Sequence, residues 1–171
     1  MPQHPLLRLA WRAIQDSLAG RNPHHLVDEL PVLNPPQACF VSLKKHGKLR
    51  GCIGSLHPVH PSREAEIVAN AVASSQRDPR FPPVKPDELP RLEVSIDLLS
   101  PPEDIASAAD LDPRLYGVIV RWQGHAGVLL PDLPGVDTAA RQIAICRDKA
   151  DIPPQAPVSL QRFTVERIGA A

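Results

Sequence analysis

Residues 39–54 read Cys39-Phe-Val-Ser-Leu-Lys-Lys-His-Gly-Lys-Leu-Arg-Gly-Cys-Ile-Gly54, and this stretch predicts a β-hairpin. Two runs of strand-forming residues, 39–45 and 48–53, flank the dipeptide His46-Gly47. A two-residue turn that ends in glycine is typical of a type I′ connection between antiparallel strands. We therefore expect an antiparallel hairpin over these residues.

The register of this hairpin follows from its turn. With His46-Gly47 as the turn, Val41 pairs with Cys52 and Cys39 pairs with Gly54. Cys39 and Cys52 are then diagonal neighbours on one face, roughly 7–8 Å apart between Cα atoms. That separation is too long for a disulfide without movement of the backbone. A bulge at Gly51 would change this register.

The remaining chain alternates between helical and strand patterns. Further expected helices cover 5–19, from an N-cap at Ser62 to about Arg77, and from an N-cap at Asp137 to about Lys149. Expected strands cover 91–99, where apolar and polar residues alternate, 117–122, 126–130 and 158–168. The hairpins bring sequence neighbours together in antiparallel pairs, and the helices cover them. The pattern predicts an α+β fold with a mainly antiparallel sheet and about three flanking helices.

Length and composition favour one folded domain. The chain has 171 residues, of which 43% are hydrophobic, and this is enough to bury a substantial core. The 21 prolines occur singly and in pairs, which indicates rigid loops between short elements. We expect a single domain over 1–171, with an N-terminal helix and loop over 1–36 and a core over 37–171.

Charge and cysteine content exclude several classes of function. The 19 basic and 19 acidic residues balance, so neither nucleic acid nor a membrane surface is expected as the main partner. No apolar stretch approaches 18 residues, and the N-terminus lacks a secretion pattern. Three cysteines without such a signal indicate free thiols in the cytoplasm.

Cys52 is the first candidate for a functional side chain. It lies between two glycines, and Arg50 precedes it by two residues. A neighbouring cation favours the thiolate, so Cys52 is a candidate nucleophile or covalent carrier. The alternative is a buried cysteine that acts as a small hydrophobic side chain. A cysteine protease would also need a histidine base, and none of the histidines has a familiar protease context.

Two segments downstream offer further candidates. Glu93 is a candidate general acid or base, and the alternatives are a solvent-facing strand edge or an ion pair with Arg80. For Asp97 the structural interpretation is favoured. Arg80 could bind a carboxylate or phosphate through its planar guanidinium. Alternatively, Asp78 forms a turn and Arg80 fastens the proline-rich loop to the core.

The sequence predicts no metal site and indicates no particular cofactor. Cys52, His57 and His60 are acceptable zinc ligands, but their spacing matches no common site. The chain contains neither a glycine-rich phosphate loop nor a dinucleotide-binding fingerprint. Any cofactor of this protein is therefore unknown from its residues.

The run Leu49-Arg-Gly-Cys-Ile-Gly54 resembles the signature of the AMMECR domain family, the AMME-syndrome candidate-gene family. The prokaryotic members are called AmmeMemoRadiSam system protein A. Together with the signature, further segments in the same order cover most of residues 38–170: Asn70-Ala71 with Asp78-Pro-Arg-Phe-Pro-Pro83, Leu92-Glu-Val-Ser95 running on to Leu99-Ser-Pro101, and Gly127-Val-Leu-Leu-Pro131.

The resemblance implies an α+β fold with two subdomains and a cleft that holds the signature. In that cleft we expect Cys52 and Glu93 as catalytic residues. We expect the substrate to be bound by residues of the signature and its neighbouring segments: Arg50, Gly51, Gly54, Ser55, Asn70, Asp78 and Arg80.

Two functions stay open at this point. The first is a cysteine-dependent enzyme or enzyme component that acts on a small substrate. The resemblance implies that its pathway includes a Memo-like protein and a radical-SAM protein. The second is a non-catalytic binding or adaptor module that uses the same cleft.

Overall fold

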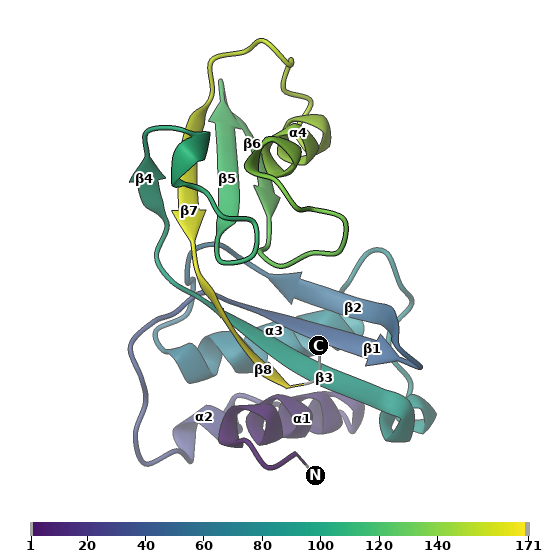
Figure 1. Ribbon diagram of the computed structural model, residues 1–171. Coiled ribbons are helices and arrows are strands. Elements are labelled where there is room, and N and C mark those ends of the chain that lie inside the picture. The colour runs from purple at the N-terminus through teal and green to yellow at the C-terminus, as the bar shows by residue number, and fades with distance from the viewer. Residues whose placement is uncertain (1, 170–171) are drawn as a thin grey trace. The chain divides into compact units, whose positions relative to one another are not determined.

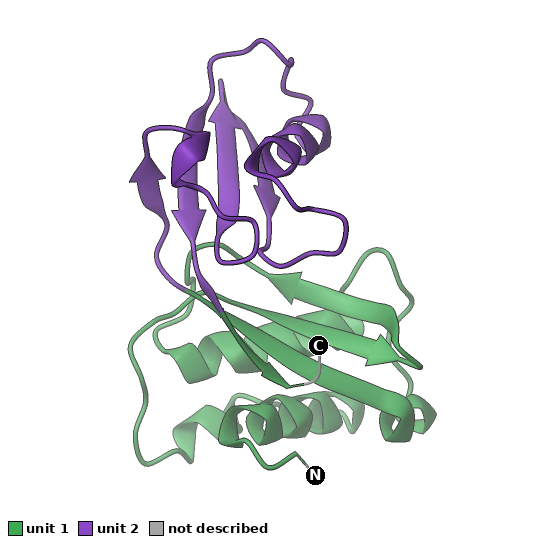
Figure 2. Cartoon of the chain, in the orientation of Figure 1, with its two compact units in different colours: residues 1–99, 166–171 green, residues 100–165 purple. Residues whose placement is uncertain are grey.

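The structure is a computed structural model, and it describes residues 2–169. The chain divides into two compact units (Figure 2). Unit 1 comprises residues 1–99 and 166–171, and unit 2 comprises residues 100–165. Unit 1 is therefore discontinuous in sequence, because the chain leaves it after Leu99 and returns at Glu166.

Unit 1 consists of a four-stranded sheet and helices on one of its faces (Figure 1). The strands lie in the order β2-β1-β3-β8, and β1 is antiparallel to both β2 and β3. The elements are α1 (Pro5–Leu18), α2 (His25–Asp28), β1 (Cys39–Lys45), β2 (Lys48–Gly54), α3 (Arg63–Gln76), the 3₁₀ helix η1 (Pro86–Arg91), β3 (Leu92–Leu99) and β8 (Val165–Gly169).

The core of unit 1 lies between the sheet and helices α1 and α3. Strands β1 and β3 each turn alternate apolar side chains toward the helices, as a strand that buries one face requires. The N-terminus of α3 is capped by Ser62, whose hydroxyl accepts a hydrogen bond from the amide of Ala65 at 3.1 Å. The predicted Ser62 cap is therefore confirmed.

The central hairpin forms at the predicted turn but in a different register. His46 and Gly47 both have positive φ angles, 52° and 74°, as a type I′ turn requires. Ser42, not Val41, pairs with Cys52, so the predicted pairing is wrong. The register shifts because Arg50 forms a bulge. The sequence allows for a bulge at the neighbouring residue, Gly51. Cys52 consequently lies on the opposite face of the sheet from the buried Val41.

Unit 2 contains a second antiparallel sheet with the strand order β4-β7-β5-β6. Helix α4 packs on β6 and β5 and closes a separate apolar core around Val118, Val120 and Cys146. The elements are β4 (Glu103–Ile105), the 3₁₀ helix η2 (Ala108–Asp110), β5 (Gly117–Trp122), β6 (His125–Leu129), α4 (Ala139–Lys149) and β7 (Ser159–Phe163).

The α+β fold with antiparallel sheets is confirmed, with two local corrections. The predicted last strand over 158–168 is two strands, β7 and β8, which belong to different sheets. Helix α4 is capped by Thr138 rather than Asp137. Strand β3 is an inner strand of its sheet, and Glu93, its second residue, is exposed. Among residues 2–169, no helix has the length and apolar character needed to cross a membrane.

Candidate functional site around Cys52

Cys52 lies on the sheet face of unit 1 that is turned away from α1 and α3. Ser42 pairs with Cys52 on one side and with Ser95 on the other, so the three side chains form one row across the sheet. The Ser42 hydroxyl donates a hydrogen bond to the Cys52 sulfur at 3.1 Å. This row places two hydroxyl groups and one thiol on the same face.

The three cysteines occupy different environments, and none of them is in a disulfide. Cys39 and Cys146 are fully buried, and burial raises their pKa values to about 12 and about 11. Cys52 is only partly buried. Cys52 is therefore the least buried of the three cysteines.

The segment 78–80 satisfies both backbone groups of Cys52 at the free edge of β2. The Cys52 amide donates to Asp78 Oδ2 at 2.9 Å, and the Cys52 carbonyl accepts from Arg80 Nη2 at 3.2 Å. Arg80 in turn donates Nε and Nη2 to the two oxygens of Asp78 at 3.1 and 2.8 Å. An edge strand needs partners of this kind, and here side chains supply them.

Asp78 and Arg80 form an ion pair in which each partner stabilises the charged form of the other. Asp78 is only 4% exposed, and the hydrogen bonds from Arg80 hold its pKa well below the ordinary range, with help from the amides of Cys52 and Arg80. The Asp78 carboxylate likewise raises the pKa of Arg80, and the proximity of Cys52 adds a smaller contribution of the same sign. The Arg80 side chain is nevertheless 54% exposed. Its guanidinium is thus fixed beside Cys52 and remains accessible.

Arg50 points its charge into an internal ion pair. Its guanidinium donates to both oxygens of Glu88, at 3.1 and 3.0 Å, and to the carbonyl of Pro82 at 2.9 Å. Lys45 donates to the same carboxylate at 2.8 Å. These hydrogen bonds, that from Arg50 first, lower the pKa of Glu88 to about 2. Arg50 therefore fastens the loop over 82–88 to the hairpin, and its predicted role toward a substrate stays a prediction.

The two glycines of the signature are required by neighbouring backbone. A Cβ on Gly51 would lie 2.1 Å from the carbonyl oxygen of Ser74 on α3. A Cβ on Gly54 would lie 2.3 Å from the carbonyl oxygen of Cys39. Both distances are far shorter than any real Cβ contact, so these positions allow close packing of β2 on α3 and β1.

Asn70 and Ser55 hold the backbone around the signature. Asn70 is buried on α3, and its amide donates to the carbonyl of Cys39 at 3.1 Å. The Ser55 hydroxyl donates to the carbonyl of His57 at 2.7 Å. Their predicted part in substrate binding also stays a prediction.

Glu93 shares the face of Cys52 but lies apart from it. It pairs with Lys44 on β1, whereas Cys52 lies in the row of Ser42. Since neighbouring strands are about 4.8 Å apart, a residue two strands away lies roughly 10 Å or more from Cys52 between Cα atoms. Glu93 therefore cannot exchange a proton directly with the Cys52 sulfur.

Two acidic residues, Glu93 and Asp97, differ in their contacts: Glu93 does not pair with Arg80, and Asp97 pairs with an arginine near the C-terminus. Arg80 pairs with Asp78 rather than Glu93. Asp97 is buried, and its carboxylate accepts hydrogen bonds from two nitrogens of the Arg167 guanidinium, Nε at 2.6 Å and Nη2 at 3.0 Å. Within residues 2–169, no group of three or more histidine, cysteine or acidic side chains is placed to hold a metal ion.

Two residues of this site were not found from the sequence. Ser42 was assigned only to a strand, because its position opposite Cys52 depends on the Arg50 bulge. Glu88 lies 38 residues from its partner Arg50. Its only local signal is its place three residues after Lys85, whose amide donates to the Glu88 carboxylate at 3.0 Å.

Comparisons with known proteins place this chain in one family. A family model described as AMMECR1 matches residues 7–168. A protein of Thermotoga maritima is 44% identical over 170 residues, which cover 96% of this chain and 97% of that protein. A protein of Clostridium acetobutylicum is 42% identical over 145 residues, 85% of this chain but 30% of its own length.

A solved structure has the same fold. The crystal structure of an uncharacterised protein from Pyrococcus horikoshii superimposes with a TM-score of 0.83 at 32% sequence identity. The match covers 95% of this chain and 88% of that one. The α+β architecture is thus shared beyond this chain.

Proposed function

This chain belongs to the AMMECR1 family, and we propose that it is a cysteine-dependent enzyme, or a component of one, that uses the Cys52 thiol on a small substrate. The observation that carries this proposal is the hydrogen bond from the Ser42 hydroxyl to the Cys52 sulfur at 3.1 Å. A hydroxyl that donates to sulfur stabilises negative charge there, and the thiolate is the reactive form of cysteine.

Arg80 supports the same proposal as the group that binds a substrate anion. Its Nε and Nη2 atoms are used by Asp78 and by the carbonyl of Cys52. The third nitrogen of Arg80, Nη1, makes no hydrogen bond to the residues that the structure describes. Asp78 therefore positions a guanidinium whose outer edge is left for a carboxylate or phosphate of the substrate.

The proposed step forms a covalent bond to sulfur. The Cys52 thiolate donates an electron pair to an electrophilic carbon of the substrate, and an S–C bond forms. The electron pair of the bond that breaks leaves with the displaced group, which takes its proton from water or from Glu93. Glu93 can fill that role only toward a substrate that extends across β1 from Cys52, because the two residues lie two strands apart.

We also infer a pathway shared with Memo-like and radical-SAM proteins from the family resemblance, and a cytoplasmic location from the free cysteines. An unpaired, partly buried thiol at Cys52 is compatible with a reducing compartment. Co-elution of this chain with either purified protein in size-exclusion chromatography tests the partnership.

Alkylation of the native protein tests the chemistry of Cys52. Iodoacetamide is added at pH values from 5 to 9, and the rate at each cysteine is measured by mass spectrometry. We expect Cys52 to react faster at pH 7 than glutathione under the same conditions. We expect Ser42→Ala to slow the reaction about threefold to tenfold, because the sulfur loses a hydrogen-bond donor.

Selective labelling alone does not decide the question, since Cys39 and Cys146 are buried whatever their chemistry. Arg91→Gln serves as the matched control, because Arg91 is an exposed arginine of the same unit. It should leave the rate unchanged, whereas Arg80→Gln should lower it. If Cys52 reacts no faster than glutathione and Ser42→Ala has no effect, the proposal is wrong.

An adaptor module is the second candidate, and the internal ion pairs favour it. Arg50 is paired with Glu88 and Arg80 with Asp78, so much of the charge near Cys52 fastens loops rather than facing a ligand. Under this alternative the loops present a rigid binding surface and Cys52 is passive. Unchanged partner binding by Cys52→Ser, together with slow alkylation, would establish it.

A further inference from the structure

A groove lies between α1 and α2 in unit 1, on the helix side of the sheet. Its volume is about 460 Å³, which falls in the range of pockets that bind small molecules. Helix α1 supplies Pro5, Arg8, Leu9 and Arg12, and α2 with the residues after it supplies Leu26, Glu29 and Leu30. Figure 1 shows the two helices side by side. Cys52 lies on the opposite face of the sheet, so the groove is separate from that site.

The helical spacing of the lining residues brings their side chains to one space. On α1 they follow the pattern i, i+3, i+4 and i+7 from Pro5, so they lie on one side of that helix. On α2 they follow the pattern i, i+3 and i+4 from Leu26. The helical backbone continues past Asp28, because the amide of Glu29 donates to the carbonyl of His25 at 3.1 Å. Both sets of side chains therefore border the same groove.

The floor of the groove is apolar. Leu9 and Leu26 are 7% and 2% exposed, and both belong to the core of unit 1. Leu30 packs against that core and is half-buried, whereas Pro5 is exposed. A hydrocarbon chain on this floor would remove apolar surface from water, both its own and that of the protein, which is favourable.

Two arginines border the apolar floor, and the protein neutralises them only in part. Arg8 and Arg12 are one turn apart on the same side of α1. Arg8 donates to the backbone carbonyl of Gln3, and among residues 2–169 no carboxylate lies within ion-pair distance of it. Arg12 is 3.7 Å from Glu29, and their side chains are 53% and 59% exposed, so this ion pair is weak. The lining therefore has a net positive charge.

We propose that this groove binds a small anionic alkyl chain, namely a medium-chain carboxylate. The hydrocarbon chain lies on Leu9, Leu26 and Leu30. The carboxylate pairs with Arg8 and Arg12, and it competes with Glu29 for the second of these. The proposal concerns the helices of unit 1 and does not depend on chemistry at Cys52.

A titration followed by NMR tests the groove with three probes. Protein with ¹³C-labelled leucine methyl groups is titrated with octanoate, with butanoate and with neutral 1-octanol. We expect saturable shifts of the Leu9, Leu26 and Leu30 methyl groups with octanoate. Butanoate and 1-octanol should bind at least threefold more weakly, because the first covers little of the floor and the second carries no charge. Leu115, a leucine of unit 2 that is 60% exposed, is the internal control and should not shift.

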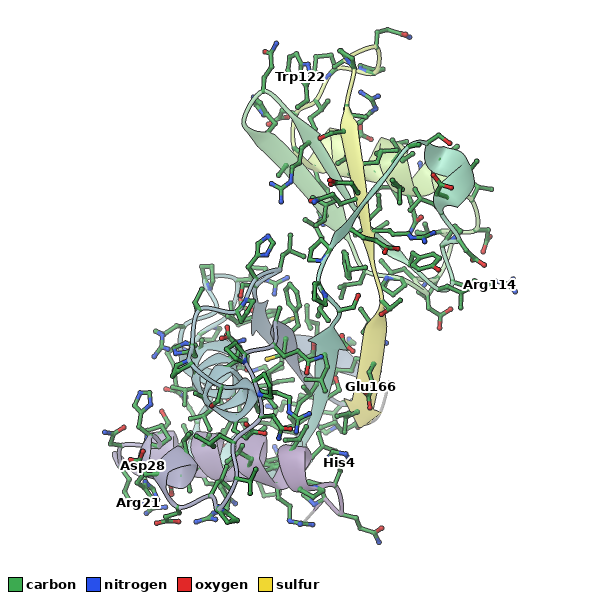
Figure 3. The ribbon with its side chains drawn as sticks, turned by 90° about the vertical axis from the view of Figure 1, so that its left-hand side faces the viewer. His4, Arg21, Asp28, Arg114, Trp122 and Glu166 are labelled. Atoms are coloured by element: carbon green, nitrogen blue, oxygen red, sulfur yellow. The ribbon has the colours of Figure 1, made fainter. Side chains whose placement is uncertain are left out.

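Glu29→Gln gives the sharpest test, because it should strengthen binding. Loss of this carboxylate releases Arg12 and removes a negative charge from the groove, so octanoate should bind about twofold to fivefold more tightly. The affinity for 1-octanol should not change. Asp28→Asn is the matched control, since Asp28 is exposed on the same helix and does not line the groove; Figure 3 shows it at the margin of unit 1.

Loss of either arginine should have the opposite effect. Arg8→Gln and Arg12→Gln should each weaken octanoate about threefold to fivefold, as the loss of an exposed ion pair predicts. Arg91→Gln is the control, because Arg91 is an exposed arginine of the same unit that does not line the groove. Circular dichroism checks that every variant is folded.

Several outcomes would overturn the proposal. They are the absence of saturable shifts at millimolar octanoate, equally tight binding of 1-octanol and octanoate, or equal effects of Glu29→Gln and Asp28→Asn. Shifts at Leu115 as large as those of the groove leucines would also count against it, since they indicate non-specific binding to exposed apolar side chains.

Discussion

Glu88 is the residue on which the loops around the signature depend. Its carboxylate accepts from Arg50 and Lys45 and from the amide of Lys85, so one side chain joins the hairpin to η1. Arg50 and Glu88 are both well covered, with side chains 13% and 11% exposed. Removing one partner of such a pair leaves the other charge poorly solvated, which costs more than the pair itself is worth.

Glu88→Gln should destabilise the protein by about 1–3 kcal/mol near pH 7, because hydrogen bonds to charged partners are lost. The folded pKa of about 2 lies below the value of 4.5 for a free glutamate. The stabilisation is therefore complete above about pH 4.5 and is lost as the pH falls toward 2. Urea unfolding at pH 3 and pH 6 should show a smaller difference between wild type and variant at pH 3.

Asp87→Asn is the control for this comparison, since Asp87 is exposed on the same 3₁₀ helix. Its effect on the free energy of unfolding should be small at both pH values. The assigned pairing would be contradicted if the free energies of unfolding of wild type and Glu88→Gln differed by the same amount at pH 6 and pH 3.

At the scale of elements, the approach of β2 to α3 determines where Cys52 lies. Gly51 places the strand against the carbonyl of Ser74, and the bulge at Arg50 turns Cys52 to the face away from the helix. Asp78 and Arg80 then occupy the backbone groups of Cys52 at the strand edge. Close packing on one side and side-chain hydrogen bonds on the other leave the thiol partly exposed.

Gly51→Ala should cost about 3 kcal/mol or more, because the new Cβ would overlap a backbone carbonyl that cannot rotate away. Gly20→Ala is the matched comparison: Gly20 has a φ angle of 71°, and a Cβ there would point into open space. Its cost comes only from backbone conformation, about 1–2 kcal/mol. Equal losses for the two variants in urea unfolding would show that the helix adjusts to the strand.

At the scale of the whole molecule, each of the two units has its own apolar core, and two chain segments connect the units. One core surrounds Ile14 in unit 1 and the other surrounds Val120 in unit 2. The sheet of unit 1 is complete only with β8, which follows unit 2 in the sequence. The place of β8 supports the single domain over 1–171 that length and composition predict, and this stays a prediction.

The two tryptophans provide one fluorescent probe for each unit, Trp11 in unit 1 and Trp122 in unit 2. Variants Trp11→Phe and Trp122→Phe each leave one probe. If the chain is a single cooperative domain, Val120→Ala should lower the free energy of unfolding by about 1–3 kcal/mol at both probes. A loss seen only at Trp122 would mean that the units unfold separately.

The sequence by itself determined what depends on neighbours along the chain. Helical spacing, the His46-Gly47 turn, the Ser62 cap and the alternation of β3 are all confirmed, because each results from contacts within a few residues. The α+β class follows from the order of these elements. The signature run also identifies the family, because a motif is read directly from the residues.

Only the tertiary structure decided what depends on residues far apart in the chain. A bulge of one residue moved Ser42 opposite Cys52, and the partner of Arg50 proved to be Glu88, 38 residues away. The last strand was divided between two sheets, although its pattern is continuous. In each case long-range backbone packing or charge pairing chose among local structures that the sequence left open: it raised a bulge only as an alternative at Gly51, and it did not pair Arg50 with Glu88.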